Sequence, residues 1–307
     1  MLYKTNILAL VGGGTYPKFS LNKITIWDDH QSKIISQIRF NSEVIQVKIR
    51  KDVIIGVLQD KIYIINISTL ETIDIVETYN NPQGIFSISY ANNDLLLAFP
   101  YAKIKGKVQL ENYLINLNGA QKKEQKIINA HDSPISYISM NIEGTIIATA
   151  SDKGTFIRIF LVSKLDHPIA VLKRGKKSVK MNFLVFDHNN EIIGCSSDSG
   201  TIHVFNISEL NKLINEQKKE EEKEDNKGEN KNKKDKNKNT KSNIKINISE
   251  RSFGKYKIGE AQSILGFYQD NRMMIVTSKG AYYKVLYDTK EGCKKLEEGA
   301  IDISYNQ

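Results

Sequence analysis

Cysteine is almost absent from this chain of 307 residues, which contains only Cys195 and Cys293. Two cysteines do not make a disulfide framework, so the class of small disulfide-stabilised secreted proteins is excluded. Long apolar runs are also lacking, and none approaches the roughly 20 residues that a membrane-spanning helix needs. The first four residues lead directly into a strand pattern rather than into a signal peptide. We therefore expect a cytoplasmic protein.

Residue patterns that would indicate an enzyme are missing too. The chain has 5 histidines, and none stands with a cysteine at the spacing of a metal site. The 35 acidic residues show no convergent pair, and no nucleophile motif is present. A glycine run at 12–14 is not followed by the Gly-Lys-Ser/Thr of a phosphate-binding loop. The sequence thus predicts a protein that is not an enzyme and has neither a metal nor a cofactor.

Positive charge is what the chain has in excess, with a formal net charge of +9. This excess favours anionic partners such as a membrane surface or a nucleic acid. Residues 217–243 contain no hydrophobic side chain, and residues 209–245 hold 12 lysines against 9 acids, which leaves about +6 on the rest of the chain. Such a segment buries too little apolar surface to offset its ordering entropy. Residues 208–247 are therefore predicted to form a disordered charged loop.

Short strand patterns recur along the chain at a regular spacing. They are rich in Ile, Val, Tyr and Phe and are separated by Gly, Asn, Asp and Ser turns. One such strand, preceded by a turn, begins near residues 23, 61, 107, 155, 201 and 281. Its intervals match the roughly 40–45 residues of a propeller blade once the charged loop is left out of the last interval. The sequence predicts an all-β protein, a single β-propeller domain over residues 1–307 with about six visible blades.

Two adjacent cations, Lys173 and Arg174, stand between near-copies of one sheet motif. The copies are Ala-Ser-Asp-Lys-Gly-Thr at 150–155 and Ser-Ser-Asp-Ser-Gly-Thr at 196–201. Side chains alternate across a strand, so the two cations point in opposite directions and each can serve a different pocket. The arrangement suits two anionic ligands bound side by side. Without further context, adjacent cations at a strand edge are more often simply solvated.

Motifs along nearly the whole chain outside the charged loop resemble those of the PROPPIN family, WD40-like propellers that bind phosphoinositides and act in autophagy. The landmarks are Leu-Ala-Leu-Val-Gly-Gly-Gly at 8–14, Ile-Trp-Asp-Asp at 26–29, Asn-Pro-Gln-Gly at 81–84, Leu-Leu-Ala-Phe-Pro at 96–100, Ala-His-Asp-Ser-Pro at 130–134 and Leu-Lys-Arg-Gly at 172–175. Within the family the chain is most similar to the shorter members. The family propeller has seven blades, so the first blade is expected to be missing from this chain.

The resemblance implies two phosphoinositide sites on adjacent blades, each using one cation of the family's Phe/Leu-Arg-Arg-Gly motif. Lysine replaces the first arginine here, and it is expected to bind phosphate but to discriminate headgroup isomers less sharply. The first site would comprise Lys173, His131, Ser151, Thr155 and Arg158, and the second Arg174, Ser197, Thr201 and His203. Ser199 stands where the family often has lysine, which leaves the second site less basic.

Membrane and partner contacts follow from the same resemblance. Lys176, Lys177 and Lys180 are predicted to add nonspecific attraction to anionic lipid, and the charged loop is predicted to adhere electrostatically if it touches the membrane. In relatives, a surface around the early loops binds a large autophagy lipid-transfer protein. The corresponding residues here are Pro17, Lys18, Asn22, Lys23, Asp28 and Asp29.

The leading hypothesis is an effector of phosphatidylinositol 3-phosphate, and of the 3,5-bisphosphate, at autophagosomal, endosomal or vacuolar membranes. The alternative is a WD40 scaffold that binds proteins but no lipid, its sites weakened by Lys173 and Ser199. In that case His131 and His203 are structural histidines, and the Ser and Thr residues are ordinary turn residues. Nucleic-acid binding is not expected, because no aromatic stacking surface accompanies the charge. We expect a monomer.

Overall fold

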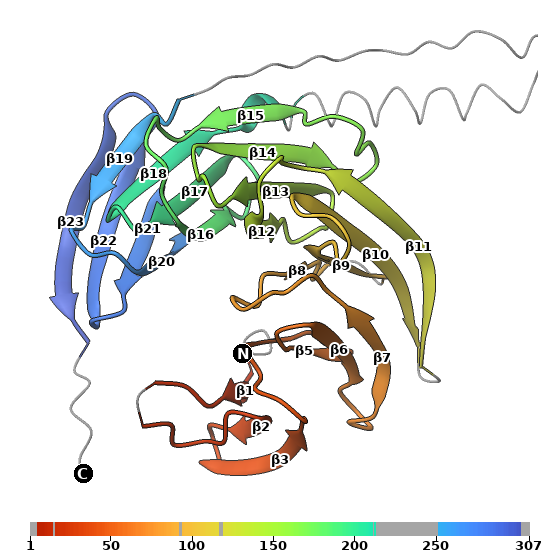
Figure 1. Cartoon of the computed structure of the whole chain (residues 1–307). Coiled ribbons are helices and arrows are strands. Elements are labelled where there is room, and N and C mark those ends of the chain that lie inside the picture. Colours follow the sequence, from red (N-terminus) through yellow and green to blue (C-terminus); the bar gives the residue numbers. More distant parts are fainter. Residues whose placement is uncertain are drawn as a thin grey trace, which may run out of the picture. The chain divides into compact units, whose positions relative to one another are not determined.

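The computed structural model describes residues 5–14, 16–91, 94–116, 119–210, 212 and 251–301. Apart from a few helical residues between 208 and 212, its regular structure consists of antiparallel β-strands, which confirms the predicted all-β class (Figure 1). The strands form six sheets, and each sheet is made of strands that are consecutive in the chain. The chain divides into two compact units, one of residues 1–138 with 142–144 and one of residues 139–141 with 145–307.

The first unit contains three sheets. Their strands are β1 (Ile7–Val11), β2 (Lys23–Asp28) and β3 (Lys33–Arg39) in the first sheet; β4 (Gln46–Ile49), β5 (Val53–Val57), β6 (Lys61–Asn66) and β7 (Thr72–Glu77) in the second; and β8 (Ser87–Ile88), β9 (Asp94–Pro100), β10 (Lys107–Asn116) and β11 (Gly119–Asn129) in the third. Consecutive strands within each sheet pair antiparallel.

The middle strands of the first unit are buried on both faces. All five residues of β5 are buried, and one core cluster joins Ile55 and Ile64 of the second sheet to Leu97 of the third. Strands with apolar residues at every position are the pattern expected when a sheet is covered on both sides. A buried arginine reinforces this packing: Arg50 forms a bidentate ion pair with Asp52 and donates to the carbonyls of Ser89 and Asp94 in the third sheet.

The second unit also contains three sheets, and the division between the units passes through the first strand of the fourth sheet. The strands are β12 (Ile135–Met140), β13 (Ile146–Ser151), β14 (Phe156–Leu161) and β15 (Ala170–Lys173) in the fourth sheet; β16 (Met181–Phe186), β17 (Ile192–Ser197), β18 (Thr201–Asn206) and β19 (Gly254–Lys257) in the fifth; and β20 (Ser263–Tyr268), β21 (Arg272–Thr277), β22 (Ala281–Asp288) and β23 (Gly292–Ala300) in the sixth.

The two faces of the fifth sheet have different neighbours, and this positions the candidate site. Ile202 and Val204 of β18 belong to a core cluster with Leu265 and Phe267 of the sixth sheet. His203 lies between them in the chain, so its side chain leaves from the opposite face. On that face the rings of His203 and Phe205 stack with centroids 6.3 Å apart.

The predicted repeat is present in all six sheets. The strands that begin near residues 23, 61, 107, 155, 201 and 281 are β2, β6, β10, β14, β18 and β22, each the last strand but one of its sheet in chain order.

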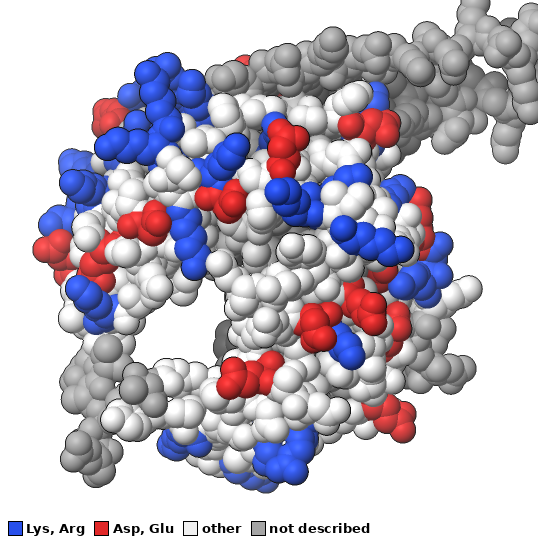
Figure 2. Space-filling view, viewed as in Figure 1, with Lys and Arg blue, Asp and Glu red and all other residues white. Residues whose placement is uncertain are grey.

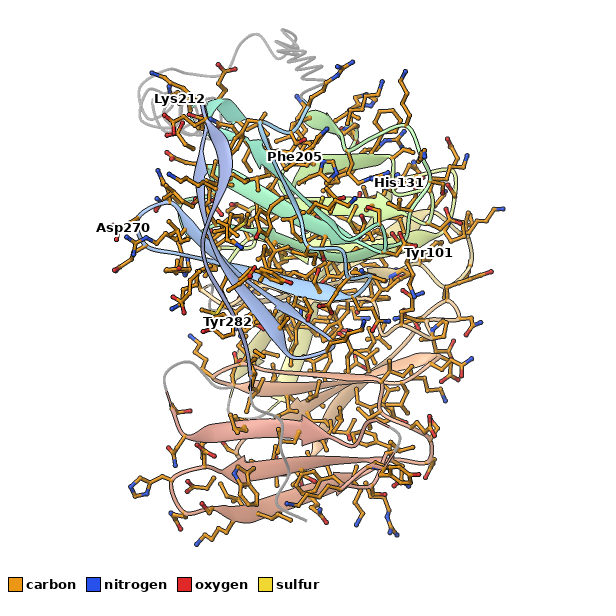
Figure 3. All side chains as sticks on the ribbon, turned by 90° about the vertical axis from the view of Figure 1, so that its left-hand side faces the viewer. Tyr101, His131, Phe205, Lys212, Asp270 and Tyr282 are labelled. Atoms are coloured by element: carbon orange, nitrogen blue, oxygen red, sulfur yellow. The ribbon has the colours of Figure 1, made fainter. Side chains whose placement is uncertain are left out.

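The charged loop falls between β18 and β19, the third and fourth strands of the fifth sheet. Phe205 and Lys212, both labelled in Figure 3, mark the end of β18 and the start of this connection. Most of the predicted disordered loop, from residue 213 to 247, lies outside the described residues.

Candidate functional site

The two copies of the sheet motif fold into the same turn. The amide of Gly154 donates to the carbonyl of Ser151 at 2.9 Å, and the amide of Gly200 donates to the carbonyl of Ser197 at 3.0 Å. Both glycines have positive φ angles, of 56° and 68°, a conformation that glycine adopts without steric cost. Each turn leads into a strand that begins with the motif's threonine or just after it, β14 in the fourth sheet and β18 in the fifth. The sequence repetition is therefore a structural repetition.

Arg174 is buried just after the end of β15 and bonds to the turn of the first motif copy. Its side chain is 7% exposed, its Nε donates to the carbonyl of Gly154 at 2.6 Å, and its Nη2 donates to the carbonyl of Lys177. Burial lowers the pKa of Arg174, while the nearby Cys195 of β17 and Asp198 of the second copy act in the opposite direction. An arginine remains protonated even so, and a buried guanidinium with donors to spare is suited to an anionic group.

His203, on β18 of the fifth sheet, lies close to Arg174. It is 5% exposed, and its Nδ1 is 3.1 Å from Oγ of Ser252. Burial lowers the pKa of His203 to about 4, and the positive charges of Arg174 and Lys255 act in the same direction. The imidazole is therefore neutral at pH 7. The predicted pairing of Arg174 with His203 thus corresponds to two side chains that lie close enough to interact electrostatically.

The remaining predicted residues of the second site stand at the end of β17 and at the start of β18, the strand that carries His203. Ser197 is 1% exposed, and its Oγ lies 2.9 Å from Oγ of Ser199. Thr201 is half-buried at the start of β18 and stands opposite Lys257 of β19. The hydroxyl groups of Ser197 and Thr201 can donate hydrogen bonds to a phosphate, and Lys257 across the strand pair adds positive charge.

Lys173 has different surroundings from Arg174. It is half-buried and pairs with Phe156 across β14 and β15. Directly paired residues of an antiparallel ladder share a face, and so do residues two apart on one strand. The side chains of Lys173, Phe156 and Arg158 therefore share one face of the fourth sheet. Ser151 is buried and Thr155 half-buried at the adjoining turn, where the Thr155 carbonyl accepts the Arg174 amide at 2.9 Å. His131, the other predicted member of this site, belongs to the first unit.

Three residues that sequence reasoning missed join this region from beyond the charged loop. Arg251 forms an isolated parallel bridge with Lys173, Ser252 contacts His203, and Lys255 pairs with His203 across β18 and β19. Their only sequence signal is that the Arg-Ser-Phe run at 251–253 resumes an apolar pattern after the charged tract. Nothing in their spacing relates them to Lys173.

Exposed lysines extend the positive surface of the second unit. Lys176, Lys177 and Lys180, predicted to attract anionic lipid, are all exposed in the segment between β15 and β16. Figure 2 shows Lys and Arg gathered also where β19 and β23 lie, at the upper left. Exposed lysines on these strands are Lys255, Lys257, Lys294 and Lys295.

The predicted partner-binding residues fall in the first unit, around β2. Pro17, Lys18 and Asp29 are exposed, while Asn22 donates to the Phe40 carbonyl at 3.2 Å and Lys23 contacts Gln37 at 3.3 Å. Asp28 is 5% exposed and accepts hydrogen bonds from the amide of Gln31 and from Asn6. The Gln31 bond is the main cause that lowers the pKa of Asp28. Asp28 therefore stabilises its own turn, and Pro17, Lys18 and Asp29 are the members best exposed to a partner.

Comparison with known proteins identifies the family. A family model described as PROPPIN matches residues 8–226, which include both motif copies and the Leu-Lys-Arg-Gly run. The chain belongs to the PROPPIN family. This confirms the resemblance drawn from the sequence motifs, and it makes the chain a member of a family of non-enzymatic propellers that bind phosphoinositides.

Two of three similar relatives carry names from autophagy. Autophagy-related protein 18e of Arabidopsis thaliana is 27% identical over 300 residues, which cover 97% of this chain and 74% of the relative. SVP1-like protein 2 of Emericella nidulans is 34% identical over 208 residues, covering 67% and 62%. Autophagy-related protein 18 of Komagataella pastoris is 27% identical over 239 residues, covering 68% and 44%. The matched part thus spans between about half and three quarters of these relatives.

Solved structures show the same fold. Hsv2 of Kluyveromyces lactis superimposes with a TM-score of 0.71 at 20% identity, covering 98% of this chain and 85% of that one. KlAtg21, in its complex with the coiled-coil of AgAtg16, gives 0.71 at 21%, covering 98% and 84%. These likenesses confirm the predicted WD40-like propeller fold.

Within the described residues, no helix is long and apolar enough to cross a membrane, and no cluster of His, Cys, Asp and Glu is arranged to hold a metal ion.

Proposed function

We propose that this PROPPIN binds phosphatidylinositol 3-phosphate, and the 3,5-bisphosphate, as a peripheral effector on autophagic, endosomal or vacuolar membranes. The observation that carries the proposal is the divergence of two consecutive cations. The Arg174 guanidinium lies near Asp198 of the second motif copy and near His203 while it donates to the carbonyls of Gly154 and Lys177, whereas Lys173 shares a face with Phe156 and Arg158. Two cationic surroundings on neighbouring sheets suit two phosphorylated headgroups, because each cation neutralises a phosphate while nearby hydroxyls supply hydrogen bonds.

The chemistry of the two sites is unequal. The second offers a guanidinium, a neutral imidazole and two hydroxyls, and water is largely excluded because Arg174, His203 and Ser197 are all buried. An ion pair formed there is screened less than one at the surface. The first offers the point charge of Lys173 beside Arg158, which favours phosphate without fixing its orientation. The second site is therefore the stronger and more selective one in this proposal.

Liposome co-sedimentation with Lys173→Thr and Arg174→Thr, singly and together, tests the proposal. Liposomes containing phosphatidylinositol 3-phosphate should retain the wild-type chain but lose the double variant, while phosphatidylinositol liposomes retain neither. Lys164→Thr is the matched control, because Lys164 is exposed in the turn at the far end of the same β14–β15 hairpin. A folded double variant that binds 3-phosphoinositide liposomes like wild type would exclude lipid binding through these sites. A wild-type chain that binds no 3-phosphoinositide liposomes would leave the protein-only scaffold.

Partner binding is a second candidate function, favoured by one comparison. The solved KlAtg21 structure is a complex with a coiled coil, and its propeller superimposes on nearly all of this chain. We propose that the exposed Pro17, Lys18 and Asp29 contribute to such a protein contact in this chain, with an autophagy lipid-transfer protein or a coiled coil as the partner. Asp29→Lys should weaken partner capture without changing liposome binding.

A further inference from the structure

Arg251 lies beside Lys173, the lysine that replaces the first arginine of the family motif in the first site. The backbone of Arg251 pairs with that of Lys173 in a parallel bridge at the outer edge of β15. Bridge partners on adjacent strands direct their side chains to the same face of a sheet. Arg251 therefore shares the face that already holds Lys173, Phe156 and Arg158, although the whole charged loop separates it from them in sequence.

This face combines three cations with an open aromatic ring. Phe156 is 39% exposed, Arg251 is exposed, and Lys173 and Arg158 are half-buried. Among the described residues, neither Lys173 nor Arg251 forms an ion pair with an acidic side chain. Positive charge that no neighbouring carboxylate neutralises is available to an anionic ligand.

The backbone that carries Arg251 is fixed on both sides. The next residue, Ser252, contacts the Nδ1 of His203 at 3.1 Å, and Phe253 packs against the core cluster with its ring 6.5 Å from that of Tyr287. A side chain on an anchored backbone loses less conformational freedom on binding than one on a mobile loop. Ser252 and Phe253 thus hold Arg251 at a position between Lys173 and His203.

Guanidinium and ammonium groups do not bind a phosphate in the same way. An arginine presents a planar fork that donates two parallel hydrogen bonds, whereas a lysine acts as a compact point charge. We propose that Arg251 supplies this fork to the first site, so that Lys173 and Arg251 together hold one phosphomonoester of an inositol headgroup. Arg251 thus determines which ring position is read. The inference rests on the proposed function, because it assigns a ligand-binding residue to one of its two sites.

Three variants separate the charge of Arg251 from its geometry. Arg251→Gln removes both, Arg251→Lys keeps the charge, and Lys173→Arg with Arg251→Gln moves the fork to the motif position. Arg272→Gln is the control, an exposed arginine of the sixth sheet. The probes are liposomes that contain phosphatidylinositol 3-, 4- or 5-phosphate, and the soluble headgroup inositol 1,3-bisphosphate. The headgroup reports the pocket without any contribution from the membrane surface.

We expect Arg251→Gln to weaken binding of the 3-phosphate liposomes and of the soluble headgroup about tenfold, as loss of a charge-assisted bidentate contact does. Arg251→Lys should lose less affinity but most of the preference for the 3-phosphate over the 4- and 5-phosphates, and the double variant should regain it. If Arg251→Gln binds and discriminates like wild type while Lys173→Thr does not bind, the inference is wrong and the proposed function stands. If the wild-type chain binds none of the probes, both are wrong.

Discussion

The Nε of Arg174 donates a hydrogen bond of 2.6 Å to the carbonyl of Gly154, so the second motif cation holds the turn that follows Ser151. The same guanidinium donates to the carbonyl of Lys177, and it lies beside Asp198 and His203 of the neighbouring sheet. Arg174 is therefore bonded into the turn of the first motif copy and lies close to the second. A ligand at the second site would meet a guanidinium that the backbone has already oriented, which lowers the entropy lost on binding.

Replacing Arg174 should cost stability as well as binding. Arg174→Met keeps the apolar stem but leaves the Gly154 carbonyl without this donor in a buried setting. We expect the free energy of unfolding to fall by about 1–3 kcal/mol. Urea unfolding followed by intrinsic fluorescence measures the change. Lys173→Met is the matched control, and an equal loss in both variants would show that Arg174 has no special structural role.

Gly154 itself tolerates no side chain. Its φ is 56°, and a Cβ at this position would lie 2.1 Å from the carbonyl oxygen of Val179. Gly154→Ala should therefore destabilise the chain by about 2 kcal/mol or more, because both the conformation and the space are unfavourable. Gly175, in the adjacent motif, has open space around its Cβ position, so Gly175→Ala should stay within about 0.5 kcal/mol of wild type. Similar melting temperatures for the two variants would contradict this account.

His203 should make stability depend on pH. Its pKa in the folded chain is about 4, below the usual value near 6.5, because the imidazole is buried beside Arg174 and Lys255. Between these values the unfolded chain binds a proton that the folded chain does not, so stability is present above pH 6.5 and is lost as pH falls toward 4. The loss should reach a few kcal/mol at most, on the order of 1.4 per pKa unit.

His203→Asn, which keeps a group able to reach Ser252, should remove this part of the pH dependence. His188→Asn should not, since His188 is exposed in the turn after β16. Thermal unfolding at several pH values between 4 and 7 measures both. The assignment fails if the slope of stability against pH is the same in wild type and His203→Asn.

The exposed lysines after β15 should act through charge alone. Changing Lys176, Lys177 and Lys180 to Gln should weaken binding to phosphatidylserine liposomes, by about 1 kcal/mol per lysine close to the surface at low salt. The wild-type advantage should shrink as salt rises, because exposed charges are screened over roughly 8 Å at physiological ionic strength. Lys33, Lys103 and Lys105 are exposed in the first unit, and their triple Gln variant is the control. Liposome binding by the wild-type chain that does not change with salt would indicate apolar insertion instead.

Much of the fold was predictable because it follows from local chemistry. Alternating Ile and Val between Gly, Asn and Asp turns specify strands, and the repeated Asp-x-Gly-Thr run specifies one turn twice, with a glycine at each position of positive φ. The predicted charged loop lies in the sequence between β18 and β19, and its disorder stays a prediction because residues 213–247 are outside the described residues. The pairing of Arg174 with His203 was anticipated only through family resemblance.

The amino-acid sequence by itself determined the strands, their spacing, the twin turns and the family, since each depends on residues close together in the chain. Only the tertiary structure decided that Arg251 pairs with Lys173, that Ser252 contacts His203 and that Arg174 is bonded to the Gly154 carbonyl. The bridge between Lys173 and Arg251 arises where the edges of the fourth and fifth sheets meet after folding. No periodicity in the sequence predicts that Lys173 and Arg251 lie side by side. The charged loop that separates them in sequence carries no pattern that relates their positions in space.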